Sequence, residues 1–482
     1  MLRFLPIEKF PKKCIALIGS MVVTTAIAAP HNFDGNVLGT SPSIDSTQKK
    51  QPQYRTIRLD FSALQNVSYA ARGTTSTQLK LPLPEGGETE FTLSDSGTFP
   101  PELAQRYPHI RSMKGVDAQG RQVRLDMSDS GVRAIVFDPD GTWLVQPAKT
   151  INKSSAESHE YISFRENAKP AWMTSSDQHL KQRESINKAI LLAQSSIKNN
   201  GKLPKNDNNH RDYRIAIATT SAYSQYFGGS VSNSLASVVE TLNRVNAIFE
   251  RDLGIHLTLV KDNDKIIFID PASDPYIEPP PESPDWDLDF TKKQNQKIVT
   301  QIIGKDNFDI GHLLELSDGG SADSNSVCQN ENKANASSGL TVAKSDGDVK
   351  LNKDFIDTVI HEIGHQFGAD HTMNGCERSS DEARNAFEPG SGSTIISYAN
   401  ECPIWNGSEA INNPLHNLQN AKDTYFHAKN IAQVRTFISG TGAACGIPRK
   451  NPNTPPSIIV PHKDVAPFIP ALCEAVFAAT SQ

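Results

Sequence analysis

The stretch HEIGHQFGADH, His361 to His371, constrains the fold more than any other part of the chain. It holds three of the 13 histidines and places a glutamate directly after the first of them. Residues four apart lie on one face of a helix, so His361 and His365 can offer imidazole nitrogens to one metal ion. Glu362 lies about 100° further round the same helix, where it can face a water molecule on the metal without being a ligand.

The segment around these histidines is apolar on one side, which predicts a buried helix. Six large apolar side chains recur at helical spacing: Phe355, Ile356, Val359, Ile360, Ile363 and Phe367. Gly364 leaves room within the helix, and Gly368 suits a left-handed helix stop, after which His371 can approach from another direction. Three neutral nitrogen ligands with one open position are typical of a catalytic zinc site rather than a closed structural one. Two other interpretations are histidines held only by hydrogen bonds and a zinc site without catalysis.

Strands and helices alternate in the region before this helix. Four segments predict strands: YRIAIATTSAY from Tyr213, IHLTLV, KIIFID and FDIGHLLEL. Two segments predict helices: SNSLASVVETLNRVNAIFERDLG, which Gly254 ends, and FTKKQNQKIVTQIIG. Such alternation favours an α/β domain with a mixed sheet.

The first half of the chain has a different pattern. Short alternating runs separated by Gly, Pro and Asp fill residues 54–147 and predict antiparallel β structure. Residues 149–212 are polar and charged, which predicts an exposed linker with one short helix at QRESINKAILLAQSSIK. None of these segments carries a catalytic constellation.

The first 28 residues predict a secretory signal peptide. A basic region ends at Lys13, an apolar run follows to Ile27, and the small side chains of Ala26 and Ala28 form a cleavage site. The alternative is an uncleaved anchor, but the apolar run is shorter than the roughly 20 residues of a membrane span. We therefore expect a secreted or extracellular protein, with the periplasm and the cell surface as alternative locations. We expect no membrane span in the mature chain. The chain has 48 basic and 54 acidic residues, so we expect no nucleic-acid partner.

HEIGHQFGADH matches HExxHxxGxxH, the signature of the metzincin zinc endopeptidases. The chain resembles secreted bacterial enzymes of the reprolysin (adamalysin)-like branch in further segments: YRIAIATT, FDIGHLLEL, HTMNGC, EPGSGSTIISYANEC and TYFHAKNIAQVRTFI. The resemblance implies that His361, His365 and His371 bind one catalytic Zn²⁺. It also implies that Glu362 is the general base, which takes a proton from the attacking water and passes it to the leaving amine. We expect a peptide or protein substrate and a monomer, and a Ca²⁺ ion is a further candidate.

The resemblance also implies an organisation along the chain. We expect an α/β (α+β) metzincin-like catalytic domain with a mixed, mostly parallel sheet and a zinc-site helix, preceded by a mainly β propeptide region. The expected parts are a signal peptide (1–28), propeptide and linker (29–211), peptidase domain (212–447), and a linker with a truncated C-terminal segment (448–482). The last segment resembles the opening of a further β-sandwich module.

Two positions depart from the family pattern. Metzincins have a methionine in a tight turn beneath the zinc, and the matching position in STIISY is Ile396. Because Ile is similar in volume to Met, we expect the fold to persist, whereas activity is less secure. Thr372 follows the third histidine, where typical reprolysins have Asp.

Five cysteines follow the leader, all in the last third of the chain. Cys376 and Cys402 bracket the turn segment, and a bridge between them would leave Cys328 and Cys445 to join the front of the domain to its closing helix. The sequence does not fix this connectivity, and Cys473 has no assigned partner. No cysteine lies between Cys14 and Cys328, so latency through a propeptide cysteine is excluded, and we expect processing within residues 199–211.

Three other residues or segments have a structural and a functional interpretation. Tyr398 can reach the metal or a developing oxyanion, but a wall or core tyrosine is the preferred interpretation. His312 would lie at a sheet edge, where a packed histidine is preferred, and that strand could pair with an extended substrate. GSGS, residues 390–393, lacks the Lys-Ser/Thr of a phosphate loop and predicts a flexible turn.

The leading functional hypothesis is a secreted zinc endopeptidase made as a zymogen. One alternative is a secreted or surface binding protein that keeps the metzincin scaffold and zinc but cleaves weakly or not at all. Another is a zinc enzyme acting on a non-peptide amide. The presence of Glu362 favours an enzyme, because a binding scaffold has no use for that carboxylate.

Overall fold

A computed structural model of the chain describes residues 54–58, 76–138, 141–148, 160–165, 209–277, 288–341, 353–376, 385–399, 403–406, 409–412, 417 and 422–450. The predicted signal peptide, the predicted helix at 182–198 and residues 451–482 lie outside these ranges. Among the helices of the described ranges, none is both long and apolar enough to cross a bilayer.

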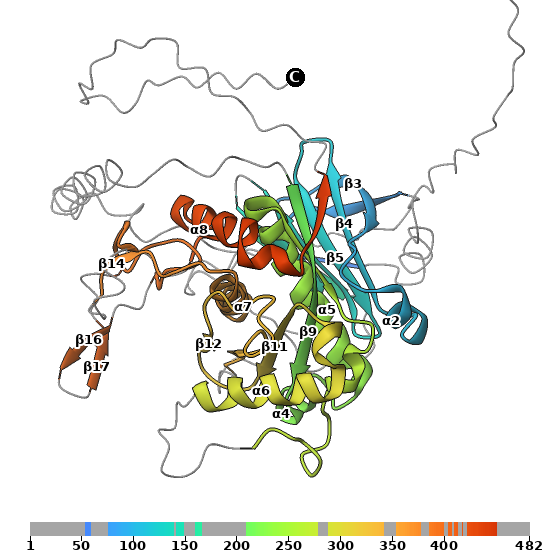
Figure 1. Cartoon of the computed structure of the whole chain (residues 1–482). Helices are drawn as coiled ribbons and strands as arrows, with labels where there is room; N and C mark the ends of the chain where they lie inside the picture. The colour runs from blue at the N-terminus through green and yellow to red at the C-terminus, as the bar shows by residue number, and fades with distance from the viewer. Residues whose placement is uncertain are drawn as a thin grey trace, which may run out of the picture. The chain divides into compact units, whose positions relative to one another are not determined.

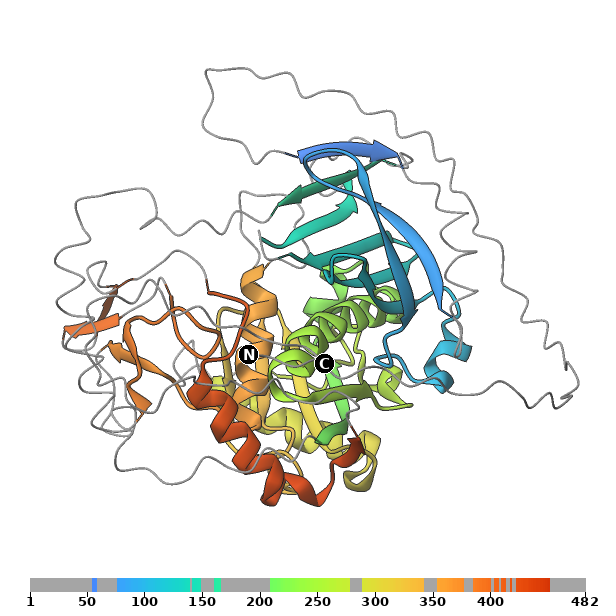
Figure 2. The same ribbon diagram turned by 90° about the horizontal axis from the view of Figure 1, so that it is seen from above.

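The N-terminal region forms one sheet of eight strands in the order β1-β8-β7-β6-β5-β4-β3-β2 (Figure 2). The strands are β1 (Tyr54–Arg58), β2 (Thr77–Pro82), β3 (Glu88–Asp95), β4 (Arg111–Asp117), β5 (Gln122–Ser128), β6 (Gly131–Phe137), β7 (Trp143–Pro147) and β8 (Glu160–Arg165). All seven pairings are antiparallel, so the prediction from alternating runs is confirmed. Two features were not predicted. They are the helix α2 (Pro101–Arg106) and strand β8, which lies within the segment expected to be a linker.

The second domain has a mixed, mostly parallel sheet, as predicted. Its strands are β9 (Asn209–Thr219), β10 (Ile255–Leu259), β11 (Ile310–Glu315), β12 (Gly320–Ala322), β13 (Ala336–Gly339) and β18 (Ile447–Lys450). The order is β10-β9-β11-β13-β12, with β18 also paired to β9. The pairs β9–β10, β9–β11 and β11–β13 are parallel, whereas β12 and β18 pair antiparallel.

Helices cover both faces of this sheet. They are α4 (Ser221–Tyr226), α5 (Val231–Ile248), α6 (Leu288–Ile303), α7 (Lys353–Gln366) and α8 (Ala428–Ser439). Successive side chains of a strand point to opposite faces. On β9, Ile215 and Ile217 therefore join the core that contains α5 and α7, whereas Ala216 and Ala218 join the core that contains α6. Figure 1 shows α6 lying across β9 and β11.

The remaining elements are short. Two strand pairs, β14 (Met373–Gly375) with β15 (Glu388–Gly390) and β16 (Pro403–Asn406) with β17 (Glu409–Asn412), follow α7. A π-turn at Phe249–Leu253 extends α5 until Gly254, which adopts the left-handed conformation (φ 70°) expected of a helix stop. Single turns of 3-10 helix lie at Asn263–Ile266, Lys305–Asn307 and Thr441–Ala444.

Two local predictions are wrong. KIIFID forms a 3-10 turn and a single bridge from Thr219 to Ile267 instead of a strand. The reason is that the Asn263 side chain accepts a hydrogen bond from the Ile217 N–H (2.8 Å) and donates one to the Ile217 carbonyl (2.9 Å), so that an amide occupies the place of a strand neighbour. The second wrong prediction is that FDIGHLLEL forms an edge strand. This segment forms β11, which lies between β9 and β13, and the edge strand at that end of the sheet is β12.

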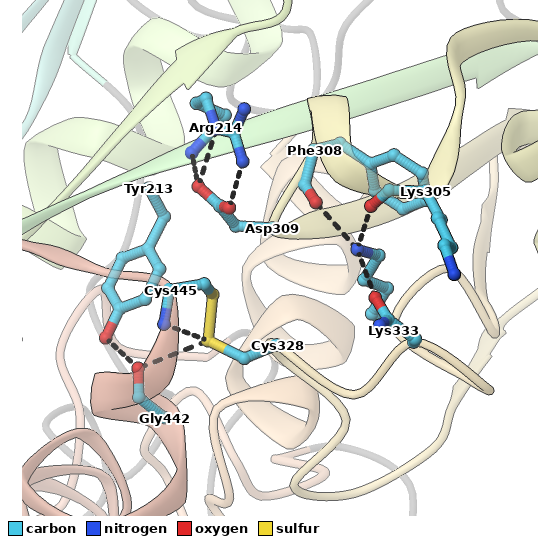
Figure 3. The surroundings of a disulfide bond; sticks show 10 residues. Tyr213, Arg214, Lys305, Phe308, Asp309, Cys328, Lys333, Gly442 and Cys445 are labelled. Carbon is cyan, nitrogen blue, oxygen red and sulfur yellow. Dashed lines mark hydrogen bonds and ion pairs between the residues drawn. A yellow bond between two sulfur atoms is a disulfide. The ribbon is translucent and has the colours of Figure 1, made fainter.

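A disulfide between Cys328 and Cys445 joins segments 117 residues apart, which confirms that predicted pair (Figure 3). The Cys445 N–H donates to Cys328 Sγ (3.2 Å), and the Tyr213 hydroxyl donates to the Gly442 carbonyl (2.9 Å). The end of the domain is thereby joined to its first strand. Cys376 is also disulfide-bonded, and its predicted partner Cys402 lies outside the described residues.

The N-terminal sheet packs on the second domain through charged groups. On β5, Val123, Leu125 and Met127 face the apolar core of the sheet, which leaves the alternate residues Arg124 and Asp126 to face α5. Arg124 Nη2 lies 2.7 Å from Glu250 Oε2, and Lys114 Nζ lies 3.1 Å from Glu250 Oε1. Further contacts join Arg106 to Asp264 and His109 to Ser232. Charge pairing is therefore a main component of this interface.

Glu250→Gln is expected to lower stability at neutral pH but much less in acid. Burial alone would raise the pKa of Glu250, but the hydrogen bond from His256 and the charges of Arg124 and Lys114 outweigh it and hold the pKa well below its usual value. The stabilisation is therefore fully present above the ordinary carboxyl pKa and is lost as the pH falls through the lower folded-state value. We expect a cost of about 3 kcal/mol at pH 7, measured as a lower midpoint temperature in calorimetry. The exposed Glu90→Gln is the control, and an equal deficit for Glu250→Gln at pH 7 and pH 3 would contradict the prediction.

Candidate metal centre

The helix α7 presents the first two histidines as predicted. Its apolar side chains Phe355, Ile356, Val359, Ile360 and Ile363 are all buried in the core, together with Phe367 just after the helix. Gly368 has φ 88°, and its N–H donates to the His365 carbonyl (2.8 Å), so the helix ends as expected of a left-handed stop. The chain then turns and brings His371 back towards the helix.

The three histidine side chains converge on one point. The Nε2 atoms of His361 and His365 are 3.0 Å apart, those of His361 and His371 are 3.1 Å apart, and those of His365 and His371 are 3.2 Å apart. Nitrogens that bind one tetrahedral zinc at about 2.0–2.1 Å are about 3.3 Å apart, so the spacing fits this ion. Within the described residues, this is the one group of at least three His, Cys, Asp or Glu side chains arranged to hold a metal.

The outer nitrogens of two rings are held by backbone carbonyls. His361 Nδ1 lies 2.8 Å from the Ile395 carbonyl, and His365 Nδ1 lies 2.6 Å from the Ala369 carbonyl. A carbonyl can only accept, so Nδ1 carries the proton and the Nε2 lone pair is free for a metal. Burial, with the nearby charge of Lys422 and of the other histidines, lowers the pKa of His361 well below its usual value. The ring therefore stays neutral, as a ligand must.

A tight turn lies beneath the cluster at the position of the metzincin methionine. The Ser397 N–H donates to the Thr394 carbonyl (3.0 Å), and Ile396 within this turn is fully buried. A methyl group added to Gly364 would lie 2.7 Å from Ile396 Cδ1, so the absence of a side chain at Gly364 lets the turn approach α7. Ile396 thus supplies an apolar floor without disturbing the turn.

Glu362 lies beside the cluster and is 6% exposed. Burial raises its pKa to about 8, and the charges of Lys422 and Lys292 oppose this only in part. The carboxylate lies against the edge strand, because a methyl group added to Gly320 on β12 would come within 2.6 Å of Glu362 Cγ and 2.9 Å of Oε1. Lys292 donates to the neighbouring Ser321 Oγ (3.1 Å) and so helps to fix this strand.

Gly320→Ala is expected to impair catalysis more than folding. The added methyl must displace the Glu362 side chain, and a misplacement of about 1 Å at a reacting group costs on the order of 100-fold in rate. We expect kcat/KM to fall by roughly 10–100-fold while the protein still binds one zinc. Peptide cleavage, metal content and the thermal midpoint, measured on one preparation, check this. Unchanged cleavage would show that Glu362 does not depend on the space at Gly320.

The other singled-out residues have structural surroundings. His312 is buried, lies 2.9 Å from Ser338 Oγ and 3.2 Å from Gln366 Oε1, and burial lowers its pKa to about 4, so the packed interpretation is confirmed. The Tyr398 ring lies 5.0 Å from the His371 ring and 6.2 Å from the His361 ring, in the position of a wall residue. In GSGS, Gly390 and Gly392 both have positive φ, and the Gly392 N–H donates to the Pro389 carbonyl, as in a turn.

Two buried polar side chains near this centre were not predicted from the sequence. Gln366 is fully buried, and its Nε2 donates to the carbonyls of Gly311 (3.0 Å) and Lys333 (3.2 Å), which fixes the end of α7 against the sheet. Glu388 is a buried carboxylate between the third histidine and the turn. The amide directly after His365 was a weak sequence signal for Gln366. No sequence signal marked Glu388.

The family model of the reprolysin-like metallo-peptidase family M12B matches residues 209–421. No curated protein matches the chain. Among solved structures, the chain is similar to metalloproteinase-II from Bacteroides fragilis, with a TM-score of 0.39 and 10% sequence identity over 78% of this chain and 94% of that chain. The domain of residues 209–421 thus belongs to the reprolysin-like M12B metallopeptidase family, and the chain is a zinc metalloprotease.

Proposed function

We propose that the chain is a secreted zinc endopeptidase, made as a zymogen, in which His361, His365 and His371 hold the metal and Glu362 is the general base. The convergence of three Nε2 atoms within 3.2 Å of one another carries this proposal. The buried position of Glu362 beside them supports it, because a carboxylate of raised pKa in a closed site suits proton transfer near neutral pH. Three converging imidazole nitrogens are typical zinc ligands, so zinc is the metal that we propose.

Each of these residues has a defined role in the mechanism that we propose. A zinc ion held by the three histidines would polarise the scissile carbonyl and lower the pKa of the attacking water. Glu362 takes a proton from that water on a carboxylate oxygen and passes it to the leaving amine. The carbonyls of Ile395 and Ala369 keep the rings of His361 and His365 oriented and in the required tautomer.

We infer that an extended substrate pairs with β12 rather than with the strand predicted from the sequence. β12 is at the end of the sheet order, and its Gly320 lies against the general base. Strand addition there would bring the substrate backbone past Glu362. The partner is then a peptide or protein, and we expect the enzyme to act as a monomer.

The zymogen part of the proposal concerns the N-terminal sheet, which would be the propeptide. Asn209–Arg211, at the end of the predicted processing segment, lie in β9, where all three pair with β18 and Arg211 also pairs with β10. Cleavage would have to open these pairings, so we propose that it falls at residues 199–208. N-terminal sequencing of the secreted protein tests this, and a protein that keeps residue 29 as its first residue would contradict it.

The endopeptidase proposal is tested by incubating the processed, zinc-loaded protein with a quenched library of peptides blocked at both ends. We expect cleavage at internal bonds, loss of cleavage after chelation and recovery when zinc is restored. A protein that holds one zinc and cuts nothing would instead support the binding-scaffold alternative, which no observation on the described residues favours at present.

Ile396→Met is expected to change activity by less than about tenfold, because a volume-conserving apolar exchange costs under about 1.5 kcal/mol of folding stability and leaves the turn in place. The turn is already formed around the buried Ile396, so methionine has little to restore. The same peptide assay measures this. A much larger gain would show that isoleucine at this position weakens the enzyme.

A further inference from the structure

Glu388 is a buried carboxylate, 6% exposed, that does not belong to the histidine cluster. Its Oε1 accepts hydrogen bonds from the N–H groups of Ser393 (2.9 Å) and Thr394 (3.0 Å). Its Oε2 accepts from the hydroxyls of Thr394 (2.6 Å) and Thr372. Four donors thus converge on one side chain that has no role in the mechanism described above.

The partners of Glu388 come from two segments that each adjoin a residue of the proposed metal centre. Thr372 directly follows His371, and its carbonyl also accepts the N–H groups of Phe387 (2.9 Å) and Glu388 (2.8 Å). Thr394 directly precedes Ile395, whose carbonyl holds His361 Nδ1. Glu388 therefore links the segment of one histidine to the turn that orients another.

We propose that Glu388 is a positioning residue, which acts through Thr372 and Thr394 to hold His371 and the Ile395 carbonyl in place for metal binding. The inference rests on the proposed assignment of His361 and His371 as ligands. Glu388 is not one of the ligands or proton-transfer groups proposed above. Thr372, which stands where the family pattern has an aspartate, donates its hydroxyl hydrogen to the carboxylate of Glu388, sixteen residues later.

The donors explain why a carboxylate is required here. An ionised carboxylate only accepts hydrogen bonds, and each of its oxygens can accept two. A glutamine at this position has one oxygen for the two N–H groups and an NH₂ group that must donate to the two hydroxyls, which reverses both hydroxyl hydrogen bonds and removes the charge that strengthens all four. Glu388→Gln therefore weakens the link while preserving the size of the side chain.

The test uses four full-length chains: wild type, Glu388→Gln, Thr372→Asp and the double variant. Zinc affinity is measured by competition with a chromogenic chelator, and the visible spectrum of the Co²⁺-substituted protein reports the geometry of the centre. We expect Glu388→Gln to weaken zinc binding by about 10–100-fold and to shift the cobalt bands. We expect Thr372→Asp alone to weaken binding too, because two carboxylates then share one buried site. The double variant restores one carboxylate and should regain most of the lost affinity.

A matched control distinguishes the proposed positioning role of Glu388 from a general contribution to folding stability. Asp309→Asn removes a buried carboxylate that pairs with Arg214 away from the centre (2.7 Å), so it should lower the thermal midpoint of the metal-free protein without changing zinc affinity. Glu388→Gln should reduce the rise in midpoint temperature that zinc produces. Zinc affinity within twofold of wild type for Glu388→Gln, or a double variant no better than the singles, would overturn the inference. A wild-type chain that binds no zinc would overturn the proposed function itself.

Discussion

Replacing Glu362 by Gln is expected to lower kcat/KM by about 10²–10⁴-fold, the usual contribution of a general acid–base group, while one zinc per chain remains bound. The amide has nearly the same shape as the carboxylate and fits the space beside Gly320, but it cannot take a proton from water. The histidine cluster and its carbonyl partners do not involve the Glu362 side chain. Steady-state cleavage of a blocked peptide, with metal content measured on the same sample, checks both parts.

The control for this experiment is Glu90→Gln, an exposed carboxylate of the N-terminal sheet, which should behave as wild type. A Glu362→Gln protein that binds zinc and retains more than about a tenth of its activity would remove Glu362 from the mechanism, since general acid–base groups contribute at least about 10²-fold. Loss of zinc together with activity would show that the variant disturbed the centre.

His365→Ala is expected to abolish zinc binding and activity together. The substitution removes one of three converging nitrogens, and alanine favours the helix, so α7 itself should form. Binding of a metal to the folded state alone stabilises it by about 4 kcal/mol when the free metal is 1,000-fold above its dissociation constant. We expect the variant to lose this zinc-dependent rise in unfolding temperature, measured by calorimetry with and without zinc.

His427→Asn provides the matched control, because it removes a histidine of the same domain outside the cluster. The His427 side chain caps α8 by accepting the Lys429 N–H, and Asn is a good residue at that position. This control should keep one zinc and full activity. A His365→Ala protein that still binds one zinc with wild-type affinity would contradict the proposed ligand set.

The local pattern predicted that the three histidine side chains lie close together, because helix geometry fixes which residues share a face. The spacing of His361 and His365, the apolar positions of α7 and the glycine stop at Gly368 all lie within one short segment. The order and type of most strands and helices followed from alternation in the same way. Contacts among residues within one or two helical turns, such as that between His361 and His365, can therefore be derived from the sequence.

Features set by distant segments could not be derived in this way. The edge strand β12 has the sequence GSA and pairs with the short strand β13, ASSG, so neither has an apolar run that marks a strand. KIIFID has a strand-like composition, yet the Asn263 side chain takes its place beside β9. Gln366 and Glu388 act through partners that lie tens of residues away or in a short irregular turn, and their burial becomes visible only in three dimensions.

The most direct test of the account is a zinc titration of the metal-free, processed protein, with bound zinc and cleavage of a peptide blocked at both ends measured at each step. We expect internal cleavage to rise in proportion to bound zinc until one equivalent is bound per chain. Binding of one equivalent without cleavage would contradict the assignment as an endopeptidase, and cleavage by the metal-free protein would contradict the role of the three histidines.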